Sequence, residues 1–227
     1  KQMPPNWGGV CLPIRTTQQT LGVMSVSVPS GREFSKDDIR LLATLSEMTG
    51  AALQRMQLHE QTVHRLEQLY ALRAVDQAIS SSRDMRLTLN VLLTHTISQL
   101  KVDAADVILL NPDSNLLELV GGRGFHTLLP ESVRLNDSFA MHAIMEHRLI
   151  SARDVEIINQ YPHFWKLWKE EEFVCYWCIP LIVKGEVKGA LEVYCRKMFI
   201  SDSEWLEFFE ALAGQAAIAI DNTQLFQ

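Results

Sequence analysis

The sequence has 227 residues and a formal net charge of −6 at pH 7, from 21 Lys and Arg against 27 Asp and Glu. Its 47% hydrophobic and 21% charged residues are typical of globular proteins and exclude a disordered, collagen-like or purely coiled-coil chain. The acidic balance, with a pI near 5.6, disfavours nucleic-acid binding. Four cysteines are too few for a disulfide framework, and no apolar run approaches the roughly 18 residues of a membrane span. We therefore expect a cytoplasmic protein without a membrane segment.

An internal repeat organises the chain. The run CLPI at residues 11–14 recurs as CIPL at residues 178–181, an offset of 167 residues. At the same offset, residues 21–24 correspond to 188–191, and residues 41–45 correspond to 208–212. The repeat predicts two copies of one unit, a hairpin followed by a helix, of which the first lacks its front half. Because the chain begins with Lys1 rather than Met, we expect it to be a piece of a longer protein.

The helix of the first copy is predicted to be unusually long. It starts near Ser35, and no Gly or Pro stops it before residues 80–82, so that its roughly 45 residues span roughly 67 Å. Spacings of four and three along this helix resemble a heptad seam for a partner helix. The residues of the seam are Leu45, Thr49, Ala52, Met56, His59, Val63, Leu66 and Tyr70. The alternative is that the stripe packs against its own domain as far as about Met56. Beyond that point we predict a homodimer contact.

The remainder of the chain is predicted to alternate between helices and hairpins. Apolar strands connected by turns and bounded by helices indicate an antiparallel sheet flanked by helices, an α+β domain. The GGRG run at 121–124 is predicted to be a turn, because it lacks the helix start of a dinucleotide-binding loop. The predicted helices cover 74–100 (with a break at 80–84), 137–147 and 203–226, and the predicted strands cover 106–111, 116–120, 149–150, 174–183 and 187–195.

Two segments resemble the GAF domain family. They are the hairpin CIPLIVKGEVKGALEV at 178–193 and the closing helix WLEFFEALAGQAAIAI at 205–220. Residues 140–155 resemble the family's third helix with the strand and Asp that follow it. The resemblance implies a six-stranded antiparallel sheet with the first and last helices on one face and a small-molecule pocket on the other. It also implies three parts: the C-terminal half of a first GAF domain (1–56), a signalling linker helix (57–73) and a complete GAF domain (74–227).

The resemblance also implies a function. Family members are mostly regulatory inputs to histidine kinases, cyclic-dinucleotide enzymes and phosphodiesterases. We therefore expect a non-enzymatic sensory module of a bacterial two-component, response-regulator or HD-GYP signalling protein, with the kinase or HD-GYP effector domain outside this chain. The alternative is a ligand-free GAF module that serves dimerisation alone.

The cysteines suggest no catalytic or metal site. Cys175 and Cys178 have CxxC spacing, but residues three apart in a strand point to opposite faces, so we predict two separate buried thiols. GAF domains that reduce methionine sulfoxide or attach a bilin covalently carry a Cys ahead of the first hairpin strand. The segment 161–172 has none, so we expect neither activity nor a covalent bilin. A partial match to the cyclic-nucleotide pattern, in Lys197, Phe199, Asp202 and Glu204, leaves a cyclic nucleotide as one candidate non-covalent ligand.

Glu192 is the polar residue that stands out, because it lies in the middle of an apolar strand with Tyr194 on the same face. A buried carboxylate needs a partner, and the alternative is a solvated edge position. An aromatic segment around 161–168 is predicted either to stack on a flat ligand or to cover the core. Asp154 either contacts the ligand or caps a helix. The predicted pocket residues are Phe125, Phe139, Asp154, Tyr161, Trp165, Trp168, Trp177, Glu192 and Tyr194.

Overall fold

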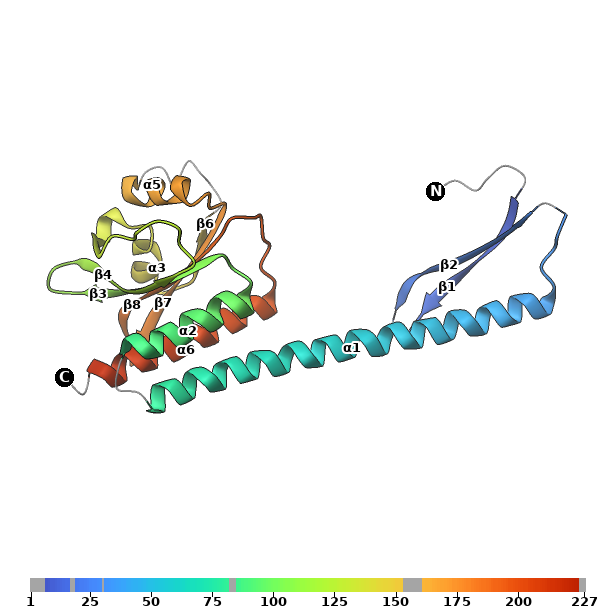
Figure 1. Cartoon of the computed structure of the whole chain (residues 1–227), viewed down its shortest axis with the longest axis horizontal. Helices are drawn as coiled ribbons and strands as arrows, with labels where there is room; N and C mark the ends of the chain where they lie inside the picture. The colour runs from blue at the N-terminus through green and yellow to red at the C-terminus, as the bar shows by residue number, and fades with distance from the viewer. Residues whose placement is uncertain (1–6, 17–18, 30, 82–84, 153–160, 225–227) are drawn as a thin grey trace. The chain divides into compact units, whose positions relative to one another are not determined.

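The computed structural model of the chain describes residues 7–16, 19–29, 31–81, 85–152 and 161–224. The chain divides into two compact units, Lys1–Leu66 and Glu67–Gln227, and the division falls within a single helix, α1 (Lys36–Ser81). Each unit has its own sheet (Figure 1). None of the helices in the described part of the chain has the length and apolarity required to cross a bilayer.

The first unit is a β-hairpin followed by the long helix. Strands β1 (Trp7–Arg15) and β2 (Thr20–Pro29) pair antiparallel. Helix α1 starts with a capping box: the Ser35 hydroxyl accepts a hydrogen bond from the Asp38 backbone N–H at 3.1 Å, and the Asp38 carboxylate accepts one from the Ser35 backbone N–H at 2.9 Å. The prediction of one uninterrupted helix from near Ser35 to Ser80 is confirmed.

Small residues of α1 make the contact with the hairpin. The hydroxyl of buried Ser46 donates to the Pro13 carbonyl at 2.8 Å, and Gly50 lies so close to Arg15 that a Cβ would stand 2.2 Å from its carbonyl oxygen. The predicted seam lies elsewhere on the helix, since all eight of its residues are exposed. The expectation that the stripe packs against its own unit as far as Met56 is therefore wrong, because the hairpin rests on the face that carries Ser46 and Gly50.

The second unit is built on a six-stranded sheet in the order β5-β4-β3-β8-β7-β6, and every neighbouring pair is antiparallel. The predicted α+β fold with a six-stranded antiparallel sheet is confirmed. The turn predicted at 121–124 is wrong in part, because β4 continues to Arg123 and pairs with β3 beyond a register shift. The strands are β3 (Ala104–Asn111), β4 (Leu116–Arg123), β5 (Ser132–Arg134), β6 (Ile150–Ala152), β7 (Cys175–Val183) and β8 (Glu186–Cys195).

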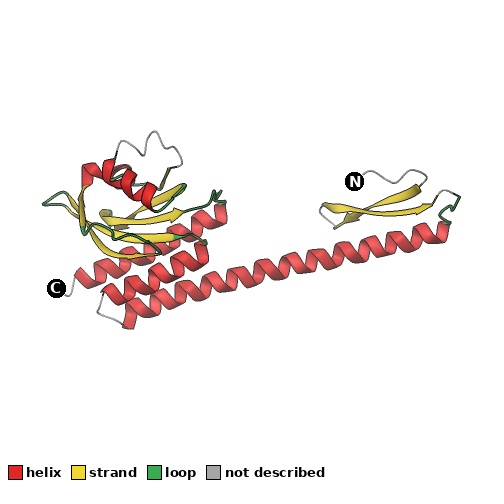
Figure 2. Cartoon of the chain, turned by 45° about the horizontal axis from the view of Figure 1, so that its top comes forward, coloured by secondary structure: helices red, strands yellow, loops and turns green. Residues whose placement is uncertain are grey.

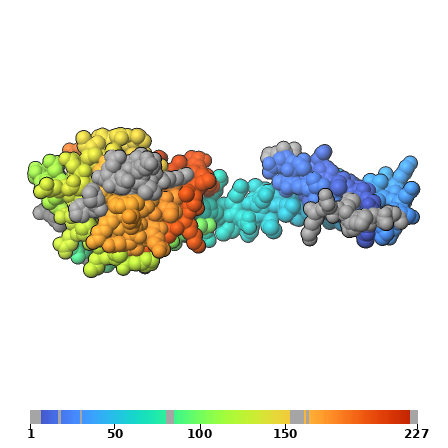
Figure 3. All heavy atoms as spheres, turned by 90° about the horizontal axis from the view of Figure 1, so that it is seen from above, coloured from blue at the N-terminus to red at the C-terminus, as the bar shows by residue number. Residues whose placement is uncertain are grey.

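Helices cover both faces of this sheet. The long helices α2 (Met85–Leu100) and α6 (Ser203–Gln224) lie side by side on one face (Figures 1 and 2). The indole N–H of Trp205 donates to the Leu100 carbonyl at 2.9 Å and fastens α6 to the end of α2. The other face carries a 3₁₀ turn, η1 (Leu135–Asp137), and two short helices, α3 (Met141–Glu146) and α5 (Pro162–Glu170). Seen from above, α5 lies at the outer surface of the unit (Figure 3).

The sheet therefore separates two apolar cores. The helix-side core joins α2, α6 and the last turns of α1 to the sheet through residues such as Val75, Leu92 and Phe209. The opposite core is rich in aromatic side chains, among them Phe139, Phe164 and Tyr176. Burial of each such side chain contributes about 1.5–3 kcal/mol. Strand alternation assigns neighbouring residues to different cores, and this confirms that Cys175 and Cys178 point to opposite faces.

Candidate ligand pocket

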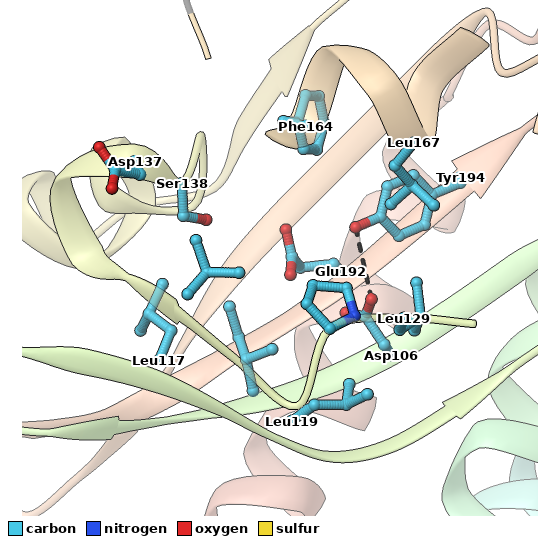
Figure 4. Close-up of a pocket in the computed structure, with 13 residues that line it drawn as sticks. Asp106, Leu117, Leu119, Leu129, Asp137, Ser138, Phe164, Leu167, Glu192 and Tyr194 are labelled. Atoms are coloured by element: carbon cyan, nitrogen blue, oxygen red, sulfur yellow. Dashed lines mark hydrogen bonds between the residues drawn. The ribbon is translucent and has the colours of Figure 1, made fainter. Parts of the chain in front are cut away.

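A pocket lies between the sheet and α5 in the second unit. The empty space in and around it is about 560 Å³ when the adjoining open solvent is counted, and most of its lining is apolar. Strands β3, β4 and β8 supply one side of it, whereas α5 and the 129–138 segment supply the other (Figure 4). The lining residues are Asp106, Ile108, Leu117, Leu119, Leu129, Pro130, Val133, Asp137, Ser138, Phe164, Leu167, Glu192 and Tyr194.

Two buried carboxyl groups stand together in this pocket. Asp106 of β3 and Glu192 of β8 are direct cross-strand partners, so that their side chains leave the sheet on the same face, next to each other. Asp106 is 3% exposed and Glu192 is 4% exposed. Two carboxyl groups this close and this deeply buried cannot both carry a charge without a large cost in free energy.

Two tyrosine hydroxyls hold the carboxyl groups in place. The Tyr176 hydroxyl donates to Glu192 Oε1, and the Tyr194 hydroxyl donates to Asp106 Oδ2 over 3.4 Å (Figure 4). The second oxygen of Asp106, Oδ1, is buried and meets no hydrogen-bond donor among the described residues. A proton shared between Asp106 and Glu192 is the one donor that the pair can supply to itself.

The protonation of the pair follows from this geometry. Burial raises the pKa of Asp106 well above its ordinary value, and the adjacent Glu192 raises it further. Burial also raises the pKa of Glu192, although hydrogen bonds from Tyr176, Asp106 and Tyr194 oppose that effect. Acids that share a site titrate together, so the pair retains a proton at a pH where isolated carboxyl groups have lost theirs.

An aromatic cluster packs beside the pocket. Phe139 stacks on Phe164 at a centroid distance of 5.6 Å, and Phe164 meets Tyr176 edge-on at 4.9 Å. The Tyr161 hydroxyl and His142 Nε2 are hydrogen-bonded at 2.7 Å, and this bond joins the start of α5 to α3. The cluster fixes the height of α5 above the sheet and thereby the depth of the pocket.

The predicted pocket residues are distributed over three environments. Glu192 and Tyr194 are among the residues that line the pocket. Phe125, Phe139, Tyr161 and Trp168 belong to the aromatic core beside it rather than to its lining. Trp165 is half-buried on α5 with Lys169 Nζ 4.4 Å from its ring centroid, also outside the lining. Asp154 lies outside the described residues.

Among the predicted residues that the structure describes, Trp177 alone lies on the face of the sheet opposite the pocket. Its side chain lies in the helix-side core, 5.0 Å from Trp205 and 5.8 Å from Phe199 between ring centroids. The physical reason is the register of the hairpin. Cys178 is the cross-strand partner of Glu192, so Trp177, one residue earlier, points away from the pocket.

Sequence analysis did not single out Asp106 or the apolar lining. For Asp106 a signal was present, because a single carboxyl group in the apolar run AADVILL has the same anomaly that drew attention to Glu192. Leu129, Pro130 and Ser138 come from irregular segments whose sequence carries no periodic pattern.

A buried ion pair holds the far end of α5. Glu171, 1% exposed, accepts hydrogen bonds from the backbone N–H groups of His126 and Thr127 at 2.8 and 2.6 Å, and it pairs with Arg196 at the end of β8. Arg196 also donates to the Gly124 carbonyl at 3.0 Å. Burial alone raises the pKa of Glu171, but the hydrogen bonds from Thr127, Arg196 and His126 outweigh it and lower the pKa. We call Glu171 and Arg196 the latch.

The possible metal ligands and the cysteines can be placed within the described part of the chain. Within the described residues, no three side chains of His, Cys, Asp or Glu come together as a metal site. All four cysteines are free; Cys11 is exposed and the other three are buried.

The family model for the GAF domain matches residues 82–221, more than half of the chain. The chain belongs to the GAF domain family. The match covers the six-stranded sheet of the second unit, all of α2 and nearly all of α6. It therefore identifies the unit that holds the pocket as a GAF domain, and the predicted family resemblance is confirmed there. No curated protein matches the sequence.

Several solved structures share this fold at low sequence identity. The GAF domain of a phosphoenolpyruvate-protein phosphotransferase from Coxiella burnetii is 18% identical, with a TM-score of 0.60 over 70% of this chain and 96% of its own. Free methionine-R-sulfoxide reductase from Neisseria meningitidis, solved in complex with its substrate, is 13% identical, with a TM-score of 0.58 over 69% and 90%. A GAF domain/HD domain protein from Geobacter sulfurreducens is 15% identical, with a TM-score of 0.54 over 65% and 98%. Such similarities establish the fold.

Proposed function

We propose that this chain is the regulatory sensory module of a bacterial signal-transduction protein, and that its GAF domain binds a small molecule in the pocket under α5. The observation that carries the proposal is the carboxyl pair of Asp106 and Glu192. Two acids buried side by side reduce the stability of the fold, and the lining around them is otherwise mostly apolar. A site that gives up stability in this way is typical of a binding function.

The relay would depend on the elements that the ligand touches. Phe164 and Leu167 bring α5 into the pocket lining, so a ligand that prefers one position of α5 shifts the population toward that position. A ligand with equal affinity for both positions would transmit nothing. The role is proposed to be regulatory rather than catalytic, because the described lining contains no thiol or other nucleophile with an adjacent base.

Related structures are compatible with this assignment. The sulfoxide reductase was solved with its substrate bound, so a protein of this fold can hold a small molecule. The Geobacter protein combines a GAF domain with an HD domain. By analogy, we propose that the effector of the present chain, a kinase or an HD-type phosphodiesterase, lies outside the sequence, and that the protein is cytoplasmic.

We further propose that the chain dimerises through α1. All eight seam residues from Leu45 to Tyr70 are exposed within one chain, and Met56 alone is 59% exposed. A run of exposed, mostly apolar residues with heptad-like spacing along one helix is the pattern of a two-helix seam. In this proposal residues 1–56 are the C-terminal half of a first GAF domain, 57–73 are the linker and 74–227 are the complete GAF domain.

A second candidate function is a ligand-free dimerisation module. The aromatic cluster favours it, because rings such as Phe139, Phe164 and Trp168 already fill much of the space beneath α5. In that case the pocket would remain empty and α1 would carry the whole function.

Native mass spectrometry of the purified full chain separates the two candidates. A dimer that carries extra mass, lost on denaturation, supports the sensor. A bare dimer, with no mass gained from a cell extract, supports the dimerisation module. A monomer would overturn the proposed seam. Met56→Glu should convert the dimer to a monomer, because it places a charge in the seam. Met145→Glu is the matched control, since Met145 is 68% exposed outside α1.

A further inference from the structure

The charged groups of the pocket all have the same sign. Its described lining contains three carboxyl groups, those of Asp106, Asp137 and Glu192, and no Lys, Arg or His. The lining hydroxyls of Ser138 and Tyr194 are neutral. A phosphate or carboxylate ligand in this pocket would face acids without a neutralising partner, and burial would strengthen the repulsion. This argues against the cyclic nucleotide considered from the sequence.

The groups around the carboxyl pair add no positive charge. From β7, Tyr176 and Cys178 face the pair, and from β8 Tyr194 does so. All three are acids, and burial is the main cause that raises the pKa of each well above its ordinary value. They therefore supply no positive charge, and a negative charge on the pair would have no counter-ion among the described residues.

Asp106 also presents an unsatisfied acceptor. Its Oδ1 atom is buried, faces no donor among the described residues and belongs to a side chain that lines the pocket. Buried acceptors are rarely left unpaired, because each unpaired group costs on the order of 1–3 kcal/mol. Once the proton that the pair shares has left, Oδ1 is an unpaired acceptor beside two negative charges, and a donor that carries a positive charge would satisfy both.

Resting on the proposed sensory function, we propose that the ligand is an organic cation, whose protonated amine or amidinium group binds between the carboxyl groups of Asp106 and Glu192. Its N–H donors supply what Oδ1 of Asp106 lacks. Its apolar body packs against the leucines of β4 and against Phe164 and Leu167 of α5. The lining thus combines one charged anchor point with a large apolar contact surface.

Binding of the cation would be coupled to release of a proton. In the free pocket the pair shares one proton and carries one negative charge. The incoming cation keeps its own protons, displaces the shared proton to solvent and leaves two carboxylates around one positive charge. Charge balances, because one proton leaves as one cation enters. Affinity for the cation should therefore rise with pH until the pair is fully ionised.

Three probes of similar shape and different charge test the ligand class on the full chain. They are 2-phenylethylammonium, 2-phenylethanol and 3-phenylpropanoate, with thermal unfolding at pH 8 as the measurement. We expect the ammonium alone to raise the unfolding temperature. In the Asp106→Asn/Glu192→Gln double variant its affinity should fall at least about tenfold. Both substitutions preserve shape and relieve a buried charge, so the variant should fold. Glu118→Gln is the matched control, because Glu118 is an exposed carboxylate on β4.

Calorimetry supplies the independent readout. Titration of the ammonium in two buffers of different ionisation enthalpy should show release of about one proton per ligand. An alcohol that stabilises as well as the ammonium, a stabilising carboxylate, or an ammonium effect that survives in the double variant would each overturn the cation proposal. If native mass spectrometry detects a bound molecule but the ammonium does not bind, the ligand class is wrong and the sensor stands. If neither detects binding, the sensory function itself fails.

Discussion

The two hairpins of the chain, β1–β2 and β7–β8, pair their strands in the same register but have different surroundings. Cys11 pairs with Ser25, and at an offset of 167 residues Cys178 pairs with Glu192. The correspondence extends to the irregularity, since the register shifts after Ile14 in one hairpin and after Leu181 in the other. The repeated sequence thus folds in the same way twice, down to the position of its bulge.

The two hairpins differ in the strand that lies beside them. Strand β8 pairs with β3 on the side away from β7, whereas among the described residues β2 pairs with β1 alone. The position of Glu192 is therefore buried beside Asp106, and the equivalent position, Ser25, is exposed. The comparison teaches that the hairpin specifies its own register, whereas the chemistry of the pocket arises only when β3 and the segments above it are added.

Paired glycine substitutions test this comparison with the largest expected effect. A Cβ at Gly189 would stand 2.0 Å from the Ile108 carbonyl oxygen of β3, whereas nothing lies within 4 Å of the equivalent Gly22. Gly189→Ala should lower the free energy of unfolding, measured with urea, by about 4 kcal/mol, because the β3 backbone must move to make room for the Cβ. Gly22→Ala should change stability by less than about 1 kcal/mol. An equal loss of stability in both variants would show that a further strand pairs with β2 in solution.

The latch of Glu171 and Arg196 is the next largest difference between the two hairpins. The position that Arg196 occupies after the second hairpin is occupied by Pro29 in the first. Glu171→Gln should cost about 2–3 kcal/mol at pH 7, since it leaves the Arg196 charge unpaired. The lowered pKa of Glu171 stabilises the fold above the ordinary glutamate value of 4.5, and that contribution is lost as pH falls through the folded-state pKa. The difference in the free energy of unfolding between wild type and variant should therefore become smaller at acidic pH. Glu207→Gln, an exposed site on α6, should show no gap at any pH.

Removal of a buried charge from the carboxyl pair should instead raise the free energy of unfolding. The raised pKa of Asp106 means that the folded state binds the proton more tightly than the unfolded chain, so stability falls as pH rises above the ordinary value of 3.8. Asp106→Asn should therefore stabilise the chain by about 1–3 kcal/mol at pH 8 and by little at pH 4. Urea unfolding across this pH range measures the difference. A variant less stable than wild type at pH 8 would show that the pair is a net structural asset.

The smallest effect is expected when a carboxylate is placed in the first hairpin. Ser25→Glu reproduces the Glu192 position on an exposed strand, so stability should change by no more than about 0.5 kcal/mol. It should also add no pH dependence between pH 5 and 8. Thermal unfolding at both pH values checks this. A clear loss at pH 8 would mean that another chain or segment buries that face.

Much of the fold could be predicted because its signals are local. The turn and alternation within each hairpin, the absence of Pro across α1 and the alternation of Glu192 and Tyr194 all depend on residues close in sequence. Strand β5 has only three residues, too few to show a period. The glycines of β4 are typical of a turn, yet Gly122 serves close packing: a Cβ there would lie 2.8 Å from Leu129 Cδ1.

The candidate site could be predicted only in part, because it depends on contacts between distant segments. Glu192 was conspicuous alone, but its pairing with Asp106 requires the register between β3 and β8, strands that lie far apart in the sequence. The same limit explains Trp177. The side of the sheet on which Trp177 lies follows from the pairing of Cys178 with Glu192, and the aromatic nature of the residue does not reveal that pairing.

The central position of β8 gives the sheet a mechanical property. Glu192 projects into the pocket, while its chain neighbours Leu191 and Val193 are fully buried on the opposite side against the α2–α6 layer. The sensing group and the helix-packing groups are thus separated by single peptide units, which are planar and stiff. In the proposed sensor, a small twist of this strand on ligand binding would be passed directly to α2 and α6, without intermediate residues, and β8 would transmit the movement.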